Sequence, residues 1–246
     1  TSTQGVAPLG AFFDATTISG LAGNDFLNAH IAWNFGDAKA GVYGPTGMDK
    51  NFATGFVAGH VFEQPGTYEV RLDIVDRDGV SKSVVLPDKV VVGDFSGETH
   101  CLSVAGDFTD APAGCMKVTG SDLAAQLAWL GSSSAGAPRR LLLRRGESWS
   151  LSSQVTLAGA GAILSAYGSG AKPRVGATSG LTISGSDMRL MDLEIEGSIN
   201  MTGNRNVALR LDVHHSIGTH GVGVGMGGDQ LFLADSAVLN HTYFSV

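Results

Sequence analysis

Hydrophobic and polar residues alternate in several short segments of the first ninety residues, which is the period of a β-strand with one buried face. Residues 29–35 show this alternation, and the longer segment 66–75 places four apolar side chains on one face: Tyr68, Val70, Leu72 and Ile74. The Asp-Gly pair at 78–79 is typical of a hairpin turn, and residues 80–92 return as a β-branched strand interrupted at Pro87. The pattern predicts a small β-sandwich.

A helical pattern comes next, at residues 121–130, where leucines and alanines recur on one face. We expect Ser121 to cap this helix and Gly131 to end it. Residues 139–145 then combine three leucines with arginines at both ends. This segment predicts a buried strand with basic ends.

From Leu151 onward, short apolar alternations recur between glycines and asparagines. Segment 193–198 aligns with segment 211–216, so that Leu193 corresponds to Leu211 and Ile195 to Val213. A repeat of about 20 residues made of short strands predicts a solenoid, in which each coil buries its apolar face against its neighbours. The sequence ends at Val246 without a capping segment. We therefore expect the N-terminal part of a longer protein, or end-to-end self-association through the uncapped coil.

Composition and charge exclude several classes of protein. The chain has 246 residues with 35 glycines, and 16% of the residues are charged, which argues against coiled coils and helical bundles. The net charge of −7 and the absence of basic runs predict that nucleic acid is not a partner. The longest apolar segments fall far short of the roughly 20 residues that span a bilayer, so no membrane partner is expected.

The first part of the chain contains four motifs in a characteristic order: Phe13-Asp-Ala, Trp33-Asn-Phe-Gly-Asp37, His60-Val-Phe62 and Pro65-Gly-Thr-Tyr68. In this order the motifs resemble the PKD domain, an immunoglobulin-like β-sandwich, over about residues 4–93. The resemblance implies that Trp33, Asp37 and His60 stabilise the fold. Segment 38–58 is longer than the usual loop of that family, and it carries two aromatic residues that could stack on sugar rings: Tyr43 and Phe52. Such domains sometimes bind calcium, for which four carboxylates are available: Asp25, Asp73, Asp76 and Asp78.

The rest of the chain resembles right-handed parallel β-helix proteins of the pectate-lyase-like type. The resemblance is carried by the helical segment 123–130, by segments 140–149 and 165–174, and by the repeat that follows them. We therefore expect an all-β protein with two domains: a PKD-like β-sandwich at 1–95, and a right-handed parallel β-helix with an N-terminal capping helix at 96–246. This architecture hosts lyases, hydrolases, epimerases and inert stalks, so it does not define the chemistry.

The two cysteines, Cys101 and Cys115, lie 14 residues apart and flank a short loop. The absence of a CxxC motif argues against zinc and against a thioredoxin-like redox site. Two alternatives remain, a disulfide or two free buried thiols. A disulfide would place the protein in an oxidising compartment.

The candidate chemistry lies in the repeat that aligns segment 193–198 with segment 211–216. If the apolar residues of this repeat point inward, the alternation turns six ionisable side chains outward, about 4.8 Å apart from coil to coil. They stack in three pairs: Asp192 on Arg210, Glu194 on Asp212, and Glu196 on His214. We name these six residues the charged ladder.

The charged ladder suggests several roles. Its carboxylates could hold Ca²⁺, with three candidate ligands: Asp192, Glu194 and Asp212. Alternatively, two carboxylates could act as acid and base on a glycosidic bond, with Arg210 neutralising a uronate and His214 abstracting a proton. The catalytic candidates are then Asp212, His214 and Arg210, and the candidates for binding substrate are Glu194 and Glu196. A transition metal would need four histidines to meet: His214, His215, His220 and His241. The ladder could also be a solvated surface without any such role.

Two functional classes follow. The first is a secreted carbohydrate-active protein, the N-terminal part of a polysaccharide lyase or glycoside hydrolase acting on an acidic glycan, with the PKD-like domain as spacer or binding aid. In this class the chain alone is expected to be inactive or weakly active, because acid, base and charge neutraliser must converge on one bond. The second is a non-catalytic extracellular binding or adhesion protein with a β-helix stalk. Both classes predict a polysaccharide partner and an extracellular or periplasmic location. No cofactor is established by the sequence, and Ca²⁺ is the candidate.

Overall fold

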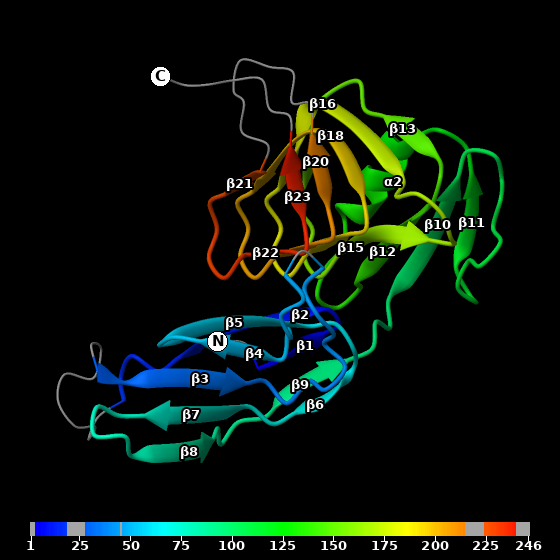
Figure 1. Cartoon of the computed structure of the whole chain (residues 1–246). Helices are drawn as coiled ribbons and strands as arrows, with labels where there is room; N and C mark the ends of the chain where they lie inside the picture. The colour runs from blue at the N-terminus through cyan, green and yellow to red at the C-terminus, as the bar shows by residue number, and fades with distance from the viewer. Residues whose placement is uncertain (1–2, 19–27, 45, 215–223, 240–246) are drawn as a thin grey trace, which may run out of the picture. The chain divides into compact units, whose positions relative to one another are not determined.

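The computed structural model describes residues 3–18, 28–44, 46–214 and 224–239 (Figure 1). The chain divides into two compact units, Thr1–Phe95 and Ser96–Val246. The protein is mostly β-strand, and the described residues contain one longer helix, α2 (Leu123–Leu130). Each unit has a hydrophobic core of its own.

The N-terminal unit is largely antiparallel. Its strands are β1 (Gln4–Val6), β2 (Leu9–Asp14), β3 (His30–Asn34), β4 (Phe52–Thr54), β5 (Val57–Phe62), β6 (Gly66–Tyr68), β7 (Arg71–Val75), β8 (Ser81–Val85) and β9 (Val90–Gly93). The order β4-β3-β7-β8 forms an antiparallel sheet, β2 pairs with β5, and β9 lies between β1 and β6. The β1–β9 pair is parallel. The core of this unit includes Trp33, Phe35 and Phe62, each at most 2% exposed.

Segment 66–75 forms two strands rather than the single strand that its alternation suggests. In β6, Tyr68 pairs with Val90 of β9, whereas β7 begins at Arg71 and pairs with β3 and β8. All four apolar residues of the segment are buried, as predicted. The chain therefore keeps one face inward while it passes from one sheet to another, and the alternation of a strand cannot show that change of partner. The predicted hairpin turn is confirmed between β7 and β8, where Gly79 has a φ of +80°.

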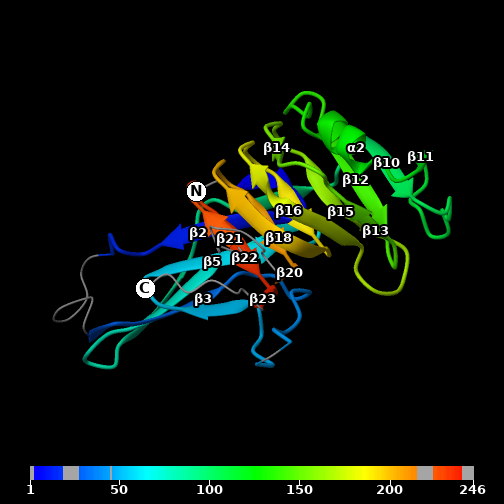
Figure 2. The same cartoon turned by 90° about the horizontal axis from the view of Figure 1, so that it is seen from above.

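The C-terminal unit consists of parallel strands. They are β10 (Glu98–Ser103), β11 (Met116–Thr119), β12 (Arg139–Arg144), β13 (Ser148–Ser150), β14 (Val155–Leu157), β15 (Ile163–Tyr167), β16 (Arg174–Ile183), β17 (Arg189–Met191), β18 (Glu194–Met201), β19 (Val207–Leu209), β20 (Asp212–His214), β21 (Val224–Met226), β22 (Phe232–Ala234) and β23 (Ala237–Leu239). One sheet has the order β11-β10-β12-β15-β17-β19-β22. The other has the order β13-β16-β18-β20-β23, with β14 beside β16 and β21 beside β18 (Figure 2). From β12 onward, successive turns of the chain, here called coils, add strands to both sheets, which is consistent with a β-helix.

The predicted repeat is confirmed for one pair of coils. Glu194 pairs with Asp212, and Arg189 pairs with Val207. The inward residues of these coils are buried as predicted: Leu193, Ile195, Leu211 and Val213. The length of a coil varies elsewhere. Ile199 pairs with Val224, which is a longer step along the chain, and the pairing of β16 with β18 shifts register between residues 177 and 181.

The predicted helix is present, but its cap is one residue later than expected. The side chain of Asp122 accepts a hydrogen bond of 2.9 Å from the backbone of Ala125, so Asp122 caps α2 in place of Ser121. Gly131 donates to the carbonyl of Leu127 at the other end, as predicted. The three leucines of α2 are buried in the same core as the coils. The helix therefore packs its apolar face onto the stacked strands.

Glycines occupy one turn in four successive coils: Gly159, Gly185, Gly203 and Gly228. A Cβ atom on Gly203 would overlap the carbonyl oxygen of Gly185, and one on Gly185 would overlap that of Gly159. The buried side chain of Asn206 joins two coils here, donating to the carbonyl of Gly185 and accepting from the backbone of Met188. The coils thus approach so closely at this glycine column that a side chain would separate them.

The structure contains the disulfide between Cys101 and Cys115, which decides between the two alternatives for these residues. Cys101 packs against Leu142 and Tyr167 in a small cluster separate from the core of the coils. The segment between the two cysteines is also held by Asp107, whose carboxylate accepts two hydrogen bonds from Arg144. Hydrogen bonding to Thr109, followed by that to Arg144, lowers the pKa of Asp107 to about 2. The disulfide is compatible with an oxidising extracellular or periplasmic location.

Candidate functional site

Four residues of the charged ladder lie on neighbouring strands in the predicted register. Glu194 and Glu196 belong to β18 and pair with Asp212 and His214 of β20. All four are partly exposed, and they alternate with buried residues along their strands. The sequence therefore placed these side chains correctly on the outer surface of the sheet.

Asp192 and Arg210 stack on each other but lie in turns, not on the strands. Their φ values are +59° and +54°, and they precede β18 and β20. Two hydrogen bonds of 2.9 and 3.0 Å join the Arg210 guanidinium to the Asp192 carboxylate, and Arg145 adds an ion pair of 3.2 Å. Burial opposes ionisation of Asp192, but the hydrogen bonds and charges of the two arginines outweigh it, so its pKa is lowered. Arg210 is thus held by Asp192 in this structure.

The other carboxylates of the ladder contact side-chain nitrogens of His, Arg or Lys residues. The Glu194 carboxylate contacts His214 Nε2 at 2.9 Å, and that of Glu196 contacts Arg174 at 2.6 Å. Asp212 contacts Lys172 Nζ at 2.8 Å. These contacts join residues that are not directly opposite each other in the strand register. They therefore differ from the three stacked pairs that the repeat predicted.

Sequence reasoning missed three members of this network: Arg145, Lys172 and Arg174. The signal was present for Arg174, because it pairs in register with Glu194 and the two positions are separated by the expected length of one coil. Alignment of segments 193–198 and 211–216 alone did not include it. The network joins four carboxylates to four Lys or Arg side chains and His214, so its charges nearly balance.

The described residues hold no group of three or more His, Cys, Asp or Glu side chains placed to bind a metal ion. The calcium set of Asp192, Glu194 and Asp212 stays a prediction. For the histidine set, His215, His220 and His241 lie outside the described residues.

The candidates of the N-terminal unit belong to several different elements. The Lys50 ammonium lies 5.5 Å from the ring centre of Tyr43, and Phe52 is 50% exposed on β4. The carboxylate of Asp73 accepts a hydrogen bond from Ser83, and that of Asp76 accepts from the backbone of the β7–β8 turn. Asp25 lies outside the part of the chain that the structure describes.

The three motif residues of this unit, Trp33, Asp37 and His60, are buried. His60 Nε2 lies 3.0 Å from the Asp37 carboxylate, and the imidazole stacks on Phe35. This supports the structural role expected for these residues. Burial lowers the pKa of His60 more than the hydrogen bond and charge of Asp37 raise it.

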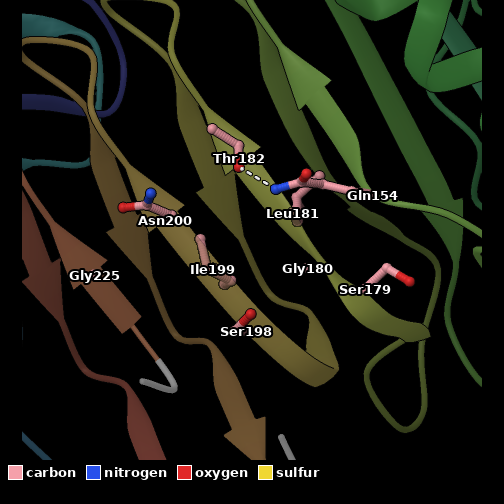
Figure 3. A pocket seen from close by; sticks show the side chains of 9 residues that line it. All are labelled: Gln154, Ser179, Gly180, Leu181, Thr182, Ser198, Ile199, Asn200 and Gly225. Carbon is pink, nitrogen blue, oxygen red and sulfur yellow. Dashed lines mark hydrogen bonds between the residues drawn. The ribbon is translucent and has the colours of Figure 1, made fainter. Parts of the chain in front are cut away.

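The structure also contains a pocket that the sequence did not reveal. Its volume is about 300 Å³, and β16 and β18 form most of its wall (Figure 3). Its lining is Gln154, Ser179, Gly180, Leu181, Thr182, Ser198, Ile199, Asn200 and Gly225. Gln154 donates a hydrogen bond of 3.2 Å to the Thr182 hydroxyl. The polar residues of the lining are serine, threonine, asparagine and glutamine, which are common on exposed strands and form no recognisable motif in the sequence. Only the fold shows that they meet in one pocket.

The pocket and the charged ladder share the outward side of the same strands. Along β18, partly or fully exposed residues alternate with buried ones, and the exposed series is Glu194, Glu196, Ser198 and Asn200. On β16, Arg174 lies at the charged end and Thr182 lies at the pocket end. We name this surface the polar strip. It changes from ionic to neutral along the strands.

Comparison of the chain with protein-family models, curated proteins and solved structures finds no match. None of the helices in the described ranges is long and apolar enough to cross a membrane.

Proposed function

We propose that the protein is a secreted carbohydrate-active protein whose C-terminal unit binds a polysaccharide along the polar strip. The observation that carries this proposal is the series of outward polar side chains along β18, which runs from the ionic Glu194 and Glu196 to the neutral Ser198 and Asn200. The neutral end of this series lines the pocket between β18 and β16 (Figure 3). A sugar chain offers hydroxyl groups at regular intervals, and a row of polar side chains on parallel strands can meet several of them. The disulfide agrees with a secreted location.

We also propose the finer architecture that the sequence suggests. The buried Trp33, Asp37 and His60 support a PKD-like sandwich acting as spacer or binding aid. The α2 helix, packed on the core of stacked parallel strands, supports a right-handed β-helix of the pectate-lyase-like type with a capping helix.

The geometry of the charged ladder favours binding over catalysis. General acid–base chemistry requires groups positioned on the substrate, but the Arg210 guanidinium is held by Asp192 and the Asp212 carboxylate by Lys172. Freeing these groups for catalysis would separate half-buried charges from their partners, whereas a paired carboxylate can still accept a hydrogen bond from a sugar hydroxyl. The ladder thus forms a charge-balanced surface beside the pocket.

A second candidate function is lyase or hydrolase activity on an acidic glycan. One contact favours it: the Glu194 carboxylate lies 2.9 Å from His214 Nε2. A carboxylate in this position orients an imidazole, which could then accept a proton through its other nitrogen. Asp212 is the neighbour of Glu194 in the register and would supply the second carboxylate.

The two candidates are tested with the whole chain on one panel of polysaccharides, pectate, alginate, glucuronan, xylan and galactan. We expect retardation in gels containing at least one of them. The variant Thr182→Trp, which places a bulky side chain in the polar strip, should lose retardation. The matched variant Thr54→Trp, at an exposed position on β4, should keep it. Equal retardation of both variants, or none for the native chain, would contradict the proposal.

Activity is measured on the same panel by unsaturated ends and by reducing sugar. We expect no turnover by this chain if it only binds. Robust turnover that disappears in both His214→Ala and Glu194→Gln would establish the second candidate.

A further inference from the structure

We infer that the pocket on β16 and β18 binds a neutral sugar unit, in preference to a uronate. This inference rests on the proposed function, and it specifies which part of the polar strip selects the glycan. It also differs from the acidic glycan that the charged ladder suggested.

The side chains of the pocket match the hydrogen-bonding chemistry of hydroxyl groups. A sugar hydroxyl donates one hydrogen bond and accepts others, and it needs partners of both kinds. The amides of Gln154 and Asn200 donate and accept, and so do the hydroxyls of Ser179, Thr182 and Ser198. The hydrogen bond from Gln154 to Thr182 orients two of these groups before a ligand binds. The pocket can therefore replace the water that surrounds several hydroxyls.

Charge argues against a uronate in this pocket. A carboxylate that leaves water needs a cationic or charge-assisted donor, because burial of an unpaired charge is costly. Of the described residues, those that line the pocket are all uncharged. The nearest cations of the polar strip in sequence, Lys172 and Arg174, pair with Asp212 and Glu196. A uronate would have to compete with these carboxylates for its counter-charge.

The dimensions of the pocket favour a short segment of sugar chain. Its volume of about 300 Å³ is at the lower end of the range of ligand pockets, about 300–1,000 Å³. Gly225 contributes to this space, since a Cβ atom there would lie 2.9 Å from the Asn200 amide oxygen. A larger residue at this position would fill the pocket. One or two sugar rings are the size of ligand that it can enclose.

The test is a titration of the full chain with cellotetraose, mannotetraose, galactotetraose and tetragalacturonate, followed by amide NMR. We expect at least one neutral tetrasaccharide to shift the signals of the pocket residues. The variants Asn200→Ala and Gln154→Ala should each weaken binding about 2- to 10-fold, the effect of one hydrogen bond. Gly225→Val should abolish binding. The matched control is Ser148→Ala, which removes an exposed hydroxyl from β13 in the same sheet, outside the pocket, and should leave affinity unchanged.

The outcomes separate the inference from the proposed function. Binding of tetragalacturonate alone, insensitive to Asn200→Ala and weakened by Arg174→Gln, would overturn the neutral pocket and leave polysaccharide binding standing. Binding of a neutral sugar with unchanged affinity in both amide variants and in Gly225→Val would place the ligand elsewhere and also overturn the inference. Binding of none of the four oligosaccharides would overturn the inference, and lack of retardation in the polysaccharide gels would overturn the proposed function. The spectra of the free variants show whether each one is folded.

Discussion

The glycine column offers a sharp test of how closely the coils stack. Gly203→Ala adds one methyl group, which would overlap the carbonyl oxygen of Gly185 in the preceding coil. Backbone is on the other side of this contact, so relief requires the two coils to move apart. Overpacking of this kind lowers the free energy of unfolding by about 1–3 kcal/mol. For a domain of this size, that loss lowers the melting temperature by about 2–4 °C per kcal/mol.

The matched control is Gly176→Ala in β16, where the nearest atom to the added Cβ is the Ser150 hydroxyl oxygen at 3.4 Å. This is ordinary van der Waals contact. Alanine should therefore be neutral here or stabilise by up to about 1 kcal/mol, because it restricts the unfolded chain. Calorimetric unfolding of the two variants under identical conditions gives the difference directly. If Gly203→Ala melts at the same temperature as Gly176→Ala, the two coils do not approach each other closely at the glycine column.

Three further predictions concern ionised groups and the disulfide. Asp192→Asn should lower the free energy of unfolding by about 1–2 kcal/mol, between the values of exposed and buried ion pairs. Since the folded-state pKa of Asp192 is lowered, this difference should be present above pH ~3.9 and should vanish as the pH falls through the folded pKa; a difference that persists in strong acid would contradict it. His60 has a lowered pKa when folded, so the unfolded state binds the proton first, and the N-terminal unit should lose stability as the pH falls below 6.5. A transition of that unit that does not depend on pH between about 7 and 5 would refute this assignment. Replacing Cys101 and Cys115 by alanine should lower the free energy of unfolding, measured in urea, by about 3 kcal/mol. In the native sequence, denatured without reduction, reaction of two thiols with maleimide would show that the disulfide is absent.

The alternation of apolar and polar residues predicted much of the fold. A strand that buries only one face needs an apolar residue at every second position, so the alternation marks each half-buried strand. Leu193 and Ile195, aligned on Leu211 and Val213, gave the correct register and the correct inward face. The same signal could not show where a strand ends. Asp192 fits the alternation of β18 but lies in the preceding turn with a positive φ, as does Arg210 before β20.

Candidate chemistry was predictable only where residue types are distinctive. Carboxylates and a histidine one coil apart drew attention to the ladder, and the structure brings them together. Their diagonal partners depend on side-chain reach, which a repeat alignment does not contain, so Lys172 was missed. The pocket was missed for a different reason. Its neutral residues, such as Ser198 and Asn200, resemble those of any exposed strand until the register assembles them.

The unequal lengths of the coils have a consequence for how such a surface can diversify. In the sheet that contains β16 and β18, each coil contributes two paired segments. The stretch of chain between the two segments differs in length from coil to coil: it is short from Glu196 to Ile199, longer from Gly176 to Leu181, and longest from His214 to Val224. Pairing resumes beyond this position, here called the corner, with an offset along the chain that differs from that before it, so the core does not fix the length of the chain there. The pocket lies along the same corner, with Ser179 and Ser198 in its wall. Insertions and deletions there can reshape a binding surface while leaving the stacked strands unchanged, which makes this corner the natural place to graft new recognition loops.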